Sequence, residues 1–488
     1  GGARRGVALA SASSIGSPSS FHEGVRVFGR VTISLICAAI LLATQSVRAD
    51  EDEALARLWC SACHLYPAPQ LLDRDTWMSS VLPEMGQRLG FAAFRGRDYP
   101  ANFDLPEGMN ATQPLLDEAD WERIISFYER KAPERLPSID WPARTATDLF
   151  TIDVPARDEN ELPMTTAVFI DESAQLLLAA DSNEMELEIY GSDLTPIGLI
   201  RPGGIVSKIR KLPSGNYLVT VIGETIGQTA LHLGLLQEIR FSEPNGEGEI
   251  ANRLIRQLHR PVDMVFGDFN SDGATDYVMA EFGSNVGALS LFLSSADGPL
   301  ARTELIAEPG AGAPVIIGDD LYVLMAQQNE RAVRVANFAD PELRRTQVLL
   351  QFPPVYGVSS LKVRDVDGDG LVDLLLTAGD NADISPIYKP YHGVYIYRGL
   401  ADGGFEQSLF FPIDGATDAV AEDFDLGGEA VLCEVARDQA EGDGLRREVR
   451  VAAGGAETLH RAVDPDRFVS MHIGVVRIHR KSAEQAVG

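Results

Sequence analysis

The run WCSACH at residues 59–64 holds the residues best suited to chemistry in this chain. Two thiols at positions i and i+3, followed directly by a histidine, are the attachment pattern of a c-type haem. Each thiol adds across one vinyl group of the porphyrin, and one helical turn brings Cys60 and Cys63 within reach of both. His64 is then expected beneath the iron as its proximal ligand. The motif predicts one covalently bound haem c.

The motif has three rival interpretations. It can arise by chance, or it can be half of a zinc site, which needs further cysteine or histidine ligands nearby. After His64 the next histidine or cysteine is His232, so such ligands are missing from the neighbouring sequence. A redox-active thiol pair is expected within a βαβ pattern, which this region lacks. Haem attachment is therefore favoured.

The sixth iron ligand is sought among the methionines that follow His64. Methionine sulfur is a common axial partner in electron-transfer cytochromes, where it raises the potential. Met78, Met85 and Met109 precede the last predicted helix of this region. Met109 lies in a loop with proline and glycine, and Met85 lies beside Pro83. The residues alone leave the choice open, since any methionine can also be core filler.

Length, charge and cysteine content limit the class of protein. The 488 residues favour two domains, and 45% hydrophobic residues are typical of a globular chain. A net charge of -29 argues against nucleic acid as a partner and is compatible with cation binding. Besides the motif there are only Cys37, in the predicted export signal, and Cys433, so a disulfide framework is excluded.

Residues 1–49 are interpreted as an upstream segment followed by a signal peptide. Arg26 and Arg30 precede an apolar run at residues 31–43, and small residues follow before an acidic start of the mature chain. The rival interpretation is a membrane anchor, but this run of 13 residues is shorter than the ~20 that a spanning helix needs. We therefore expect a protein exported to the periplasm or the cell exterior, with no stable membrane span after cleavage.

Residues 50–140 are predicted to form a small all-α, cytochrome c-like haem domain. Helices are expected at residues 53–59, 71–89 and 117–131. The last of them places aromatic and aliphatic residues on one face, at positions 121, 124, 125 and 128, and Pro133 ends it. Such an aromatic face is suited to packing against a haem, although it is equally typical of a plain core.

Residues 141–488 are predicted to be mainly β, because helical periodicity ends and a strand–turn–strand unit recurs. A period of about 40 to 60 residues is typical of propeller blades. We expect a β-propeller of about seven blades whose last blade can be incomplete, since the tail from residue 468 is irregular. The recurring units lie at residues 167–178, 208–221, 264–279, 315–325, 361–377 and 419–433.

Two acidic turns within these repeats have the ligand spacing of a calcium loop. Oxygen donors are expected at positions 1, 3, 5 and 9, with a backbone carbonyl at position 7 and glycine at position 6. Neither turn has a glutamate at position 12, and both join strands, so they are not EF-hands. A third turn, at residues 423–429, lacks acids at positions 5 and 9 and is not expected to bind. We predict about two Ca²⁺ ions, with the ligands Asp268, Asn270, Asp272, Ala274 and Asp276 in the first turn and Asp365, Asp367, Asp369, Leu371 and Asp373 in the second.

The runs VFGDFN at 265–270 and VRDVDGD at 363–369 resemble the FG-GAP or VCBS repeats of integrin-α-like β-propellers. Residues 379–395 are similar to a signature of one exported bacterial group of these proteins, which often carries an N-terminal Cys-x-x-Cys-His domain. The run from Cys60 through Met85 to Tyr128 resembles the haem segment of that group. The resemblance implies Met85 as the sixth ligand in preference to Met109. It implies a fold and metal sites, but no reaction.

Two functions follow as hypotheses. The first is an exported c-type haem protein that transfers electrons, with the propeller docking a redox partner protein. The alternative is an extracytoplasmic propeller that binds a glycan or protein, in which the haem is secondary. No catalytic constellation is visible, so an enzymatic role beyond redox chemistry stays open. Lys389, Tyr391 and His392 are interpreted as part of a structured loop that locks one blade to the next, in preference to a polar site.

Overall fold

The computed structural model describes most of the chain beyond residue 50. It covers residues 1, 51–98, 110–139, 150–153, 164–226, 232–242, 247–295, 298–327, 329–379, 385, 387–422, 431–438, 446–452 and 477–480. The predicted signal peptide, Met109 and the turn at 423–429 lie outside these residues, as does the predicted domain boundary at 140/141. Two compact units are distinguished, residues 1–58 and residues 59–488.

The region after the haem motif is helical, as predicted. Helical structure spans residues 51–60, and the predictions at 71–89 and 117–131 are confirmed in outline. A short hairpin of β1 and β2 means that the described region is not all-α. The elements are η1 (Pro69–Leu71), α2 (Arg74–Thr76), η2 (Trp77–Val81), α3 (Leu82–Arg88), β1 (Ala93–Phe94), β2 (Arg97–Asp98) and α4 (Glu118–Lys131).

A π-helical turn joins α2 to α3. The helix begins at Asp73, whose side chain accepts a hydrogen bond from the Thr76 backbone N–H at 2.8 Å. Pro83 has no N–H, and its ring would clash with the carbonyl four residues earlier. Widening the preceding turn relieves this conflict, and the Leu82 N–H bonds to the carbonyl of Trp77, five residues back.

Helix α4 has the charge pattern of a stable isolated helix and one apolar face. Acidic residues occupy its first turn and basic residues its last, so both ends complement the helix dipole. The chain leaves the helix at Ala132, directly before Pro133. None of the helices within the described part of the chain is long and apolar enough to cross a membrane. The buried face consists of Trp121, Ile124, Ile125, Phe127 and Tyr128.

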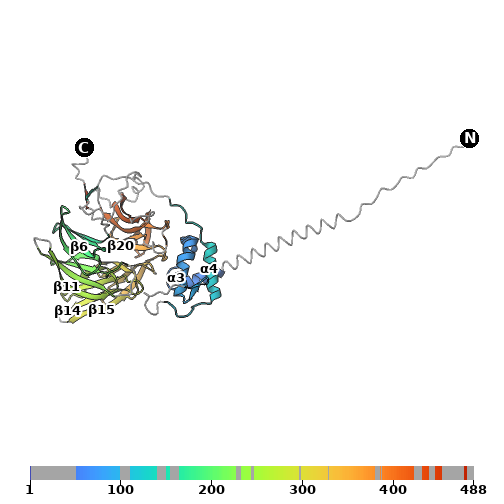
Figure 1. Ribbon diagram of the computed structural model, residues 1–488, viewed down its shortest axis with the longest axis horizontal. Coiled ribbons are helices and arrows are strands. Elements are labelled where there is room, and N and C mark those ends of the chain that lie inside the picture. The colour runs from blue at the N-terminus through green and yellow to red at the C-terminus, as the bar shows by residue number, and fades with distance from the viewer. Residues whose placement is uncertain are drawn as a thin grey trace. The chain divides into compact units, whose positions relative to one another are not determined.

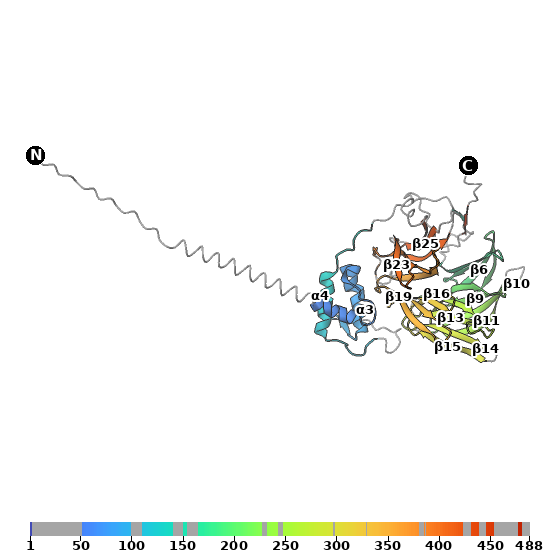
Figure 2. The same ribbon diagram turned by 180° about the vertical axis from the view of Figure 1, so that it is seen from behind.

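The remainder of the described chain is a β-propeller, whose successive sheets can be followed in Figures 1 and 2. In each sheet of three or four strands the strands pair antiparallel in sequence order, which is the meander of a propeller blade. Five sheets have four strands. They are β4 (Thr165–Asp171), β5 (Leu176–Asp181), β6 (Glu186–Gly191) and β7 (Pro196–Ile200); β8 (Val206–Lys211), β9 (Tyr217–Val221), β10 (Gly234–Ser242) and β11 (Glu247–Leu258); β12 (Pro261–Gly267), β13 (Asp276–Glu281), β14 (Ala288–Ser295) and β15 (Gly298–Ile306); β16 (Ala311–Ile317), β17 (Asp320–Met325), β18 (Arg331–Ala336) and β19 (Arg345–Gln351); and β20 (Val358–Arg364), β21 (Asp373–Ala378), β22 (Gly393–Gly399) and β23 (Phe405–Pro412).

The prediction of about seven blades was wrong: the described residues form five four-stranded blades. A sixth sheet has three described strands, β24 (Ala416–Glu422), β25 (Val431–Asp438) and β26 (Arg446–Ala452). Strand β27 (Arg477–Arg480) pairs with β3 (Phe150–Asp153), which lies near the start of the β region. Each recurring sequence unit marks only the first two strands of a sheet. The six units thus correspond one to one to these six sheets, whereas the seventh blade expected at the tail from residue 468 contributes only β27 within the described residues.

The core lies between successive sheets. The second strands of the blades are buried on both faces, which explains their unbroken apolar runs. One cluster joins the third and fourth blades and includes Val278, Leu289, Leu321 and Val333. Because each blade contributes one face to the cluster on either side, removing a large side chain here is expected to loosen two blades at once.

Strand order separates the connections of the propeller into two groups. Successive strands are antiparallel, so the turn after a first strand and the turn after a second strand lie at opposite ends of the blade. The two acidic turns follow the first strands β12 and β20. The connections after β9, β11, β13 and β21 belong to the other end, where the first strands of a propeller run in a common direction.

Candidate functional site

The two thiols of the haem motif are both free. Cys63 is exposed and Cys60 is partly buried. Burial raises the pKa of the Cys60 thiol to about 11, against a smaller effect of a hydrogen bond with Tyr128 that lowers it. A redox-active dithiol needs a lowered pKa, because the thiolate is the reactive species. The environment of Cys60 therefore argues against the thiol–disulfide interpretation of the motif.

One ring nitrogen of His64 bonds to the backbone, which fixes the protonation of the other. Its Nδ1 lies 3.0 Å from the backbone oxygen of Leu65. A carbonyl oxygen can only accept, so Nδ1 carries the proton and Nε2 keeps its lone pair in the neutral ring. Burial lowers the pKa of His64, which favours this neutral form. This is the tautomer and protonation state that an axial haem ligand needs.

Two buried aromatic residues hold the loop that follows the motif. The Tyr128 hydroxyl donates to the Pro67 carbonyl oxygen at 2.8 Å, and Trp77 Nε1 donates to that of Pro69 at 2.9 Å. The two rings lie 4.5 Å apart between centroids. Helix α4 and the π-helical turn are thus both fixed to the loop after His64. The sequence indicated an aromatic face on α4, but not these two bonds to proline carbonyls.

The structure leaves the choice of sixth ligand as a prediction. Met85 lies half-buried in α3, one turn beyond the π-helical segment, and Met78 lies half-buried within that segment. Met109 cannot be compared with them, because it lies outside the described residues.

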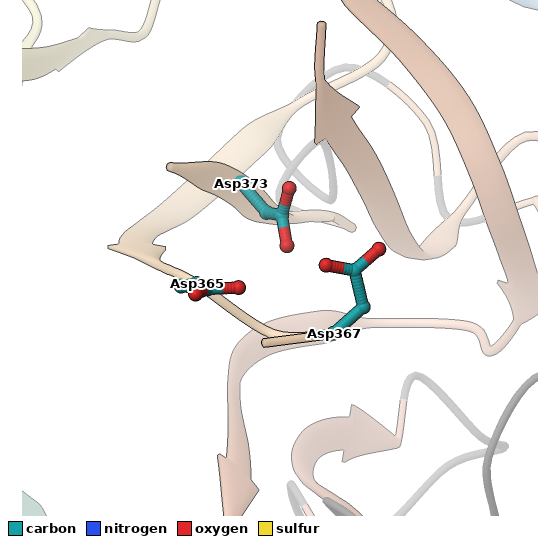
Figure 3. Close-up of side chains that lie close together, drawn as sticks. All are labelled: Asp365, Asp367 and Asp373. Atoms are coloured by element: carbon teal, nitrogen blue, oxygen red, sulfur yellow. The ribbon is translucent and has the colours of Figure 1, made fainter. Parts of the chain in front are cut away.

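The second acidic turn brings three of its predicted ligands together. One carboxylate oxygen from each of Asp365, Asp367 and Asp373 lies within 4.8 Å of the others, and Figure 3 shows the three carboxylates facing a common space. Asp369 is not in this group, and its Oδ1 accepts a hydrogen bond from the Leu371 N–H at 2.8 Å. Leu371 could act only through its carbonyl oxygen, as predicted for position 7.

The first acidic turn repeats the hydrogen bonds of the second at equivalent positions. Asp268 accepts from the backbone N–H groups of Asp272 and Gly273, at 3.0 and 2.9 Å. In the second turn, Asp365 accepts from the backbone N–H groups of Asp369 and Gly370. At the next position, the Ala274 N–H donates to Asp272 in the first turn, and the Leu371 N–H donates to Asp369 in the second. Within the described residues, however, a grouping of three acids within 4.8 Å occurs only in the second turn.

The aspartate at position 9 of each turn is fully buried and connects the turn to a neighbouring strand. Asp276 accepts from the Phe269 N–H at 2.9 Å and from the Ser294 N–H at 2.7 Å. Asp373 makes the equivalent bonds at 2.8 and 2.9 Å, to Val366 and Gly399. These carboxylates stabilise the turns even without a metal ion, so ion binding has to be tested at the other positions.

Arg398 moderates the negative charge of the second turn. Its Nε lies 3.1 Å from Oδ2 of Asp367, and both side chains are partly exposed. An exposed ion pair of this kind contributes little stability by itself. Because it offsets only one of the grouped carboxylates, repulsion between the remaining charges still favours a bound cation.

The loop between β21 and β22 contacts the helical region as well as its own blade. The Tyr391 hydroxyl donates to the Leu71 carbonyl oxygen at 2.7 Å, and Ser385 Oγ lies 3.0 Å from Thr76 Oγ1. The Tyr391 ring also stacks on Tyr356, which precedes β20, with centroids 4.5 Å apart. The interpretation as a structural loop fits these contacts, but sequence reasoning missed the helical region as its partner.

Lys389 is fully buried in this loop, where its Nζ donates to the Ser385 carbonyl oxygen at 3.0 Å. Burial lowers the pKa of Lys389 to about 8, although Asp414 and Asp73 partly oppose this. The ordinary value is 10.5, so the folded state binds fewer protons than the unfolded state between these pH values. Burying the charged Lys389 therefore lowers the free energy of unfolding by its full amount below pH 8, and this destabilisation disappears as the pH rises towards 10.5.

We therefore expect the free energy of unfolding of the wild type to rise between pH 8 and 10 relative to Lys389→Met. Chemical denaturation of both proteins across this range measures the difference. The result would be contradicted by a constant difference, which would mean that Lys389 titrates normally. Because Tyr391 and Tyr395 are unchanged in both proteins, their own titration cancels in the comparison.

One histidine pair lies outside every motif that the sequence indicated. His232 and His259 are 27 residues apart, in the connections after β9 and β11, and their Nε2 atoms lie 3.0 Å apart. Glu281, 22 residues beyond His259, contacts the same cluster. These three residues are too far apart in the sequence to form a recognisable motif.

Comparison with known proteins shows similarity at the level of the propeller. No protein-family profile matches the chain, and no curated protein matches it by sequence. The structure resembles the Dos1 propeller, with 10% identity over 59% of this chain and 67% of that one, and a TM-score of 0.39. It also resembles virginiamycin B lyase from Staphylococcus aureus, with 13% identity over 62% and 88% of the chains and a TM-score of 0.39. A protein from Lactobacillus plantarum matches 65% of this chain and 88% of its own, with 12% identity and a TM-score of 0.41.

Proposed function

We propose that this chain is an exported c-type haem protein that transfers single electrons. The observation that carries the proposal is the state of His64, whose Nδ1 bonds to the Leu65 carbonyl oxygen and whose Nε2 is thereby left unprotonated. His64 directly follows the second of two free cysteines, Cys60 and Cys63, whose spacing is the one that haem attachment needs. Haem iron supplies a reversible one-electron couple when bound.

The donor set fits a haem better than a zinc ion. Cys60, Cys63 and His64 offer two thioether positions and one nitrogen ligand, whereas a structural zinc site needs four ligands. The Trp121 indole N–H is buried and has no acceptor among the described residues. It lies two helical turns from Tyr128 on the buried face of α4. A carboxylate of the porphyrin would provide the missing acceptor.

The residues around the motif would position the group and limit its exposure to water. Tyr128 and Trp77 fix the loop after His64, and the Leu65 carbonyl fixes the orientation of the imidazole. A rigid setting reduces the rearrangement that accompanies each change of charge on the iron. Met85 is proposed as the sixth ligand, because its sulfur would favour the reduced iron and raise the potential.

The propeller is proposed to be of the FG-GAP or VCBS type, stabilised by about two Ca²⁺ ions. Support comes from two acidic turns that each follow the first strand of a blade, in two different blades. Their hydrogen bonds match, and each has a buried aspartate at position 9. The opposite connections, after β13 and β21, contact the helical region through Asn285 and Tyr391. The propeller would thus hold the haem region and offer its remaining surface to a redox partner protein.

Protein film voltammetry on the holoprotein tests electron transfer directly. We expect one reversible one-electron wave in the wild type. In Met85→Leu the wave should move to lower potential, and the sulfur-to-iron absorption band should disappear, because the thioether ligand is lost. Met78→Leu is the matched control, since Met78 lies in the same continuous helix and should keep both properties. A haem-containing protein with no reversible wave would overturn the proposal of electron transfer.

A further inference from the structure

The histidine pair His232 and His259 is held in place from one side by a buried carboxylate. The side chain of His259 is only 15% exposed, and its Nδ1 lies 3.1 Å from Oε2 of Glu281. The same oxygen accepts the backbone N–H of His259 at 2.9 Å. A carboxylate can only accept, so Nδ1 of His259 carries the proton and its Nε2 presents a lone pair.

Glu281 is itself fixed by a second set of contacts. Its side chain is fully buried, and its Oε1 accepts from Ser290 Oγ at 2.7 Å and from Arg302 Nη2 at 2.8 Å. Arg302 also pairs with Glu304 at 3.3 Å, so its positive charge is offset twice. The order carboxylate, histidine, unprotonated Nε2 is the support that metal-binding histidines commonly have in proteins.

The two rings are not arranged as a head-on hydrogen-bonded pair. Their Nε2 atoms are 3.0 Å apart, but the ring centroids are separated by only 3.9 Å, at an interplanar angle of 64°. A head-on bond would separate the centres by the nitrogen–nitrogen distance plus both ring radii, which is well beyond 3.9 Å. The rings instead meet in an edge-to-face arrangement, with the two Nε2 atoms at the contact.

The separation of the two Nε2 atoms, though not the tilt of the rings, matches what one metal ion demands of two imidazoles, so the exposed His232 ring would turn on binding. Metal–nitrogen bonds of ~2.0–2.1 Å place two nitrogens roughly 3 Å apart around a tetrahedral or square-planar ion. His232 is exposed, so water or a ligand of the protein's surroundings can reach the remaining positions. A chain with a net charge of -29 also attracts cations to its surface.

We propose that His232 and His259 bind a divalent transition-metal ion such as Zn²⁺ or Cu²⁺, with Glu281 orienting His259. Two protein ligands leave open coordination positions, which distinguishes this site from a closed structural zinc site. The connection after β13, which begins beyond Glu281, also carries Asn285, whose Oδ1 accepts from Arg88 of α3 at 3.0 Å. The site therefore lies on the propeller end that contacts the helical region, away from the acidic turns.

Calorimetric titration of the full-length holoprotein with Zn²⁺, in excess calcium to occupy the acidic turns, tests this site. We expect one Zn²⁺ to bind the wild type and its affinity to fall more than tenfold in His232→Ala and in His259→Ala. Glu281→Gln should weaken binding by roughly 10–100-fold, as is typical when the carboxylate behind a metal-binding histidine is lost. Glu304→Gln is the matched control, because Glu304 pairs with Arg302 but forms no ion pair with His259 among the described residues.

Electron paramagnetic resonance of Cu²⁺ provides a second measurement that does not depend on affinity alone. One equivalent of Cu²⁺ should show hyperfine coupling to two imidazole nitrogens in the wild type and to one in His232→Ala. His232 is exposed, so this variant should unfold at the wild-type temperature. Equal Zn²⁺ affinity in the wild type and His232→Ala, or no imidazole coupling to Cu²⁺, would overturn the proposal and leave a proton-sharing histidine pair.

Discussion

A Cys60→Ala/Cys63→Ala protein, made in a host with c-type maturation machinery, is expected to purify without covalent haem. Both thioether bonds depend on these sulfurs, and His64 alone would hold the iron through one exchangeable bond. Haem staining after denaturing electrophoresis and the absorption spectrum measure the loss, which should exceed tenfold relative to the wild type.

Cys433→Ala is the matched control for this experiment. It removes a cysteine in β25, outside the motif, and should leave the haem content unchanged. The thermal unfolding of the propeller should also persist in the double variant, because its sheets do not depend on the thiols. Covalent haem at the wild-type level in Cys60→Ala/Cys63→Ala would refute the attachment site, whatever the origin of the colour.

Removal of calcium is expected to lower the melting temperature of the wild type by several degrees. An ion that binds only the folded state, at a free concentration a hundredfold above its Kd, stabilises that state by about 2.7 kcal/mol. Without it, carboxylates of Asp365, Asp367 and Asp373 repel one another across less than 4.8 Å. Differential scanning calorimetry with calcium and with a chelator measures the change.

Asp367→Asn separates ion binding from the stability of the turn. Asparagine can still accept the Asp369 N–H that Asp367 accepts at 3.2 Å, but it provides no charged ligand. We expect the difference between calcium and chelator to shrink in this variant, while the melting temperature in chelator stays near that of the wild type. Asp402→Asn, in the turn between β22 and β23 of the same blade, is the control and should keep the full difference. An unchanged melting temperature of the wild type in chelator would count against calcium in both turns.

Local sequence signals predicted the elements of this protein well, because each depends on residues close in the chain. Helix α4 follows from the spacing of Trp121, Ile124 and Tyr128 together with Pro133 at its end. The first two strands of every sheet follow from two apolar runs around an acidic or glycine turn. The number of blades was overestimated because the tail from residue 468 was counted as a further blade, whereas its described residues form only β27, which pairs with β3.

The candidate sites likewise differ in how far they could be predicted from local sequence. Asp365, Asp367 and Asp373 lie within nine residues, so their proximity could be predicted from the turn alone. Asp369 belongs to the same pattern, yet its carboxylate bonds to the backbone at Leu371 instead of joining the group. The contacts of Tyr391 with Leu71, and of His232 with His259 and Glu281, depend on how distant connections meet. The spacing of residues along the sequence does not predict such long-range contacts.

The intact mass of the purified wild type, made with c-type maturation machinery, tests the central claim most directly. Peptide mapping of the same sample locates the group. The account predicts a mass increase of one haem that stays with the denatured chain and maps to the peptide containing Cys60 and Cys63. A denatured chain with the mass of the polypeptide alone would contradict it.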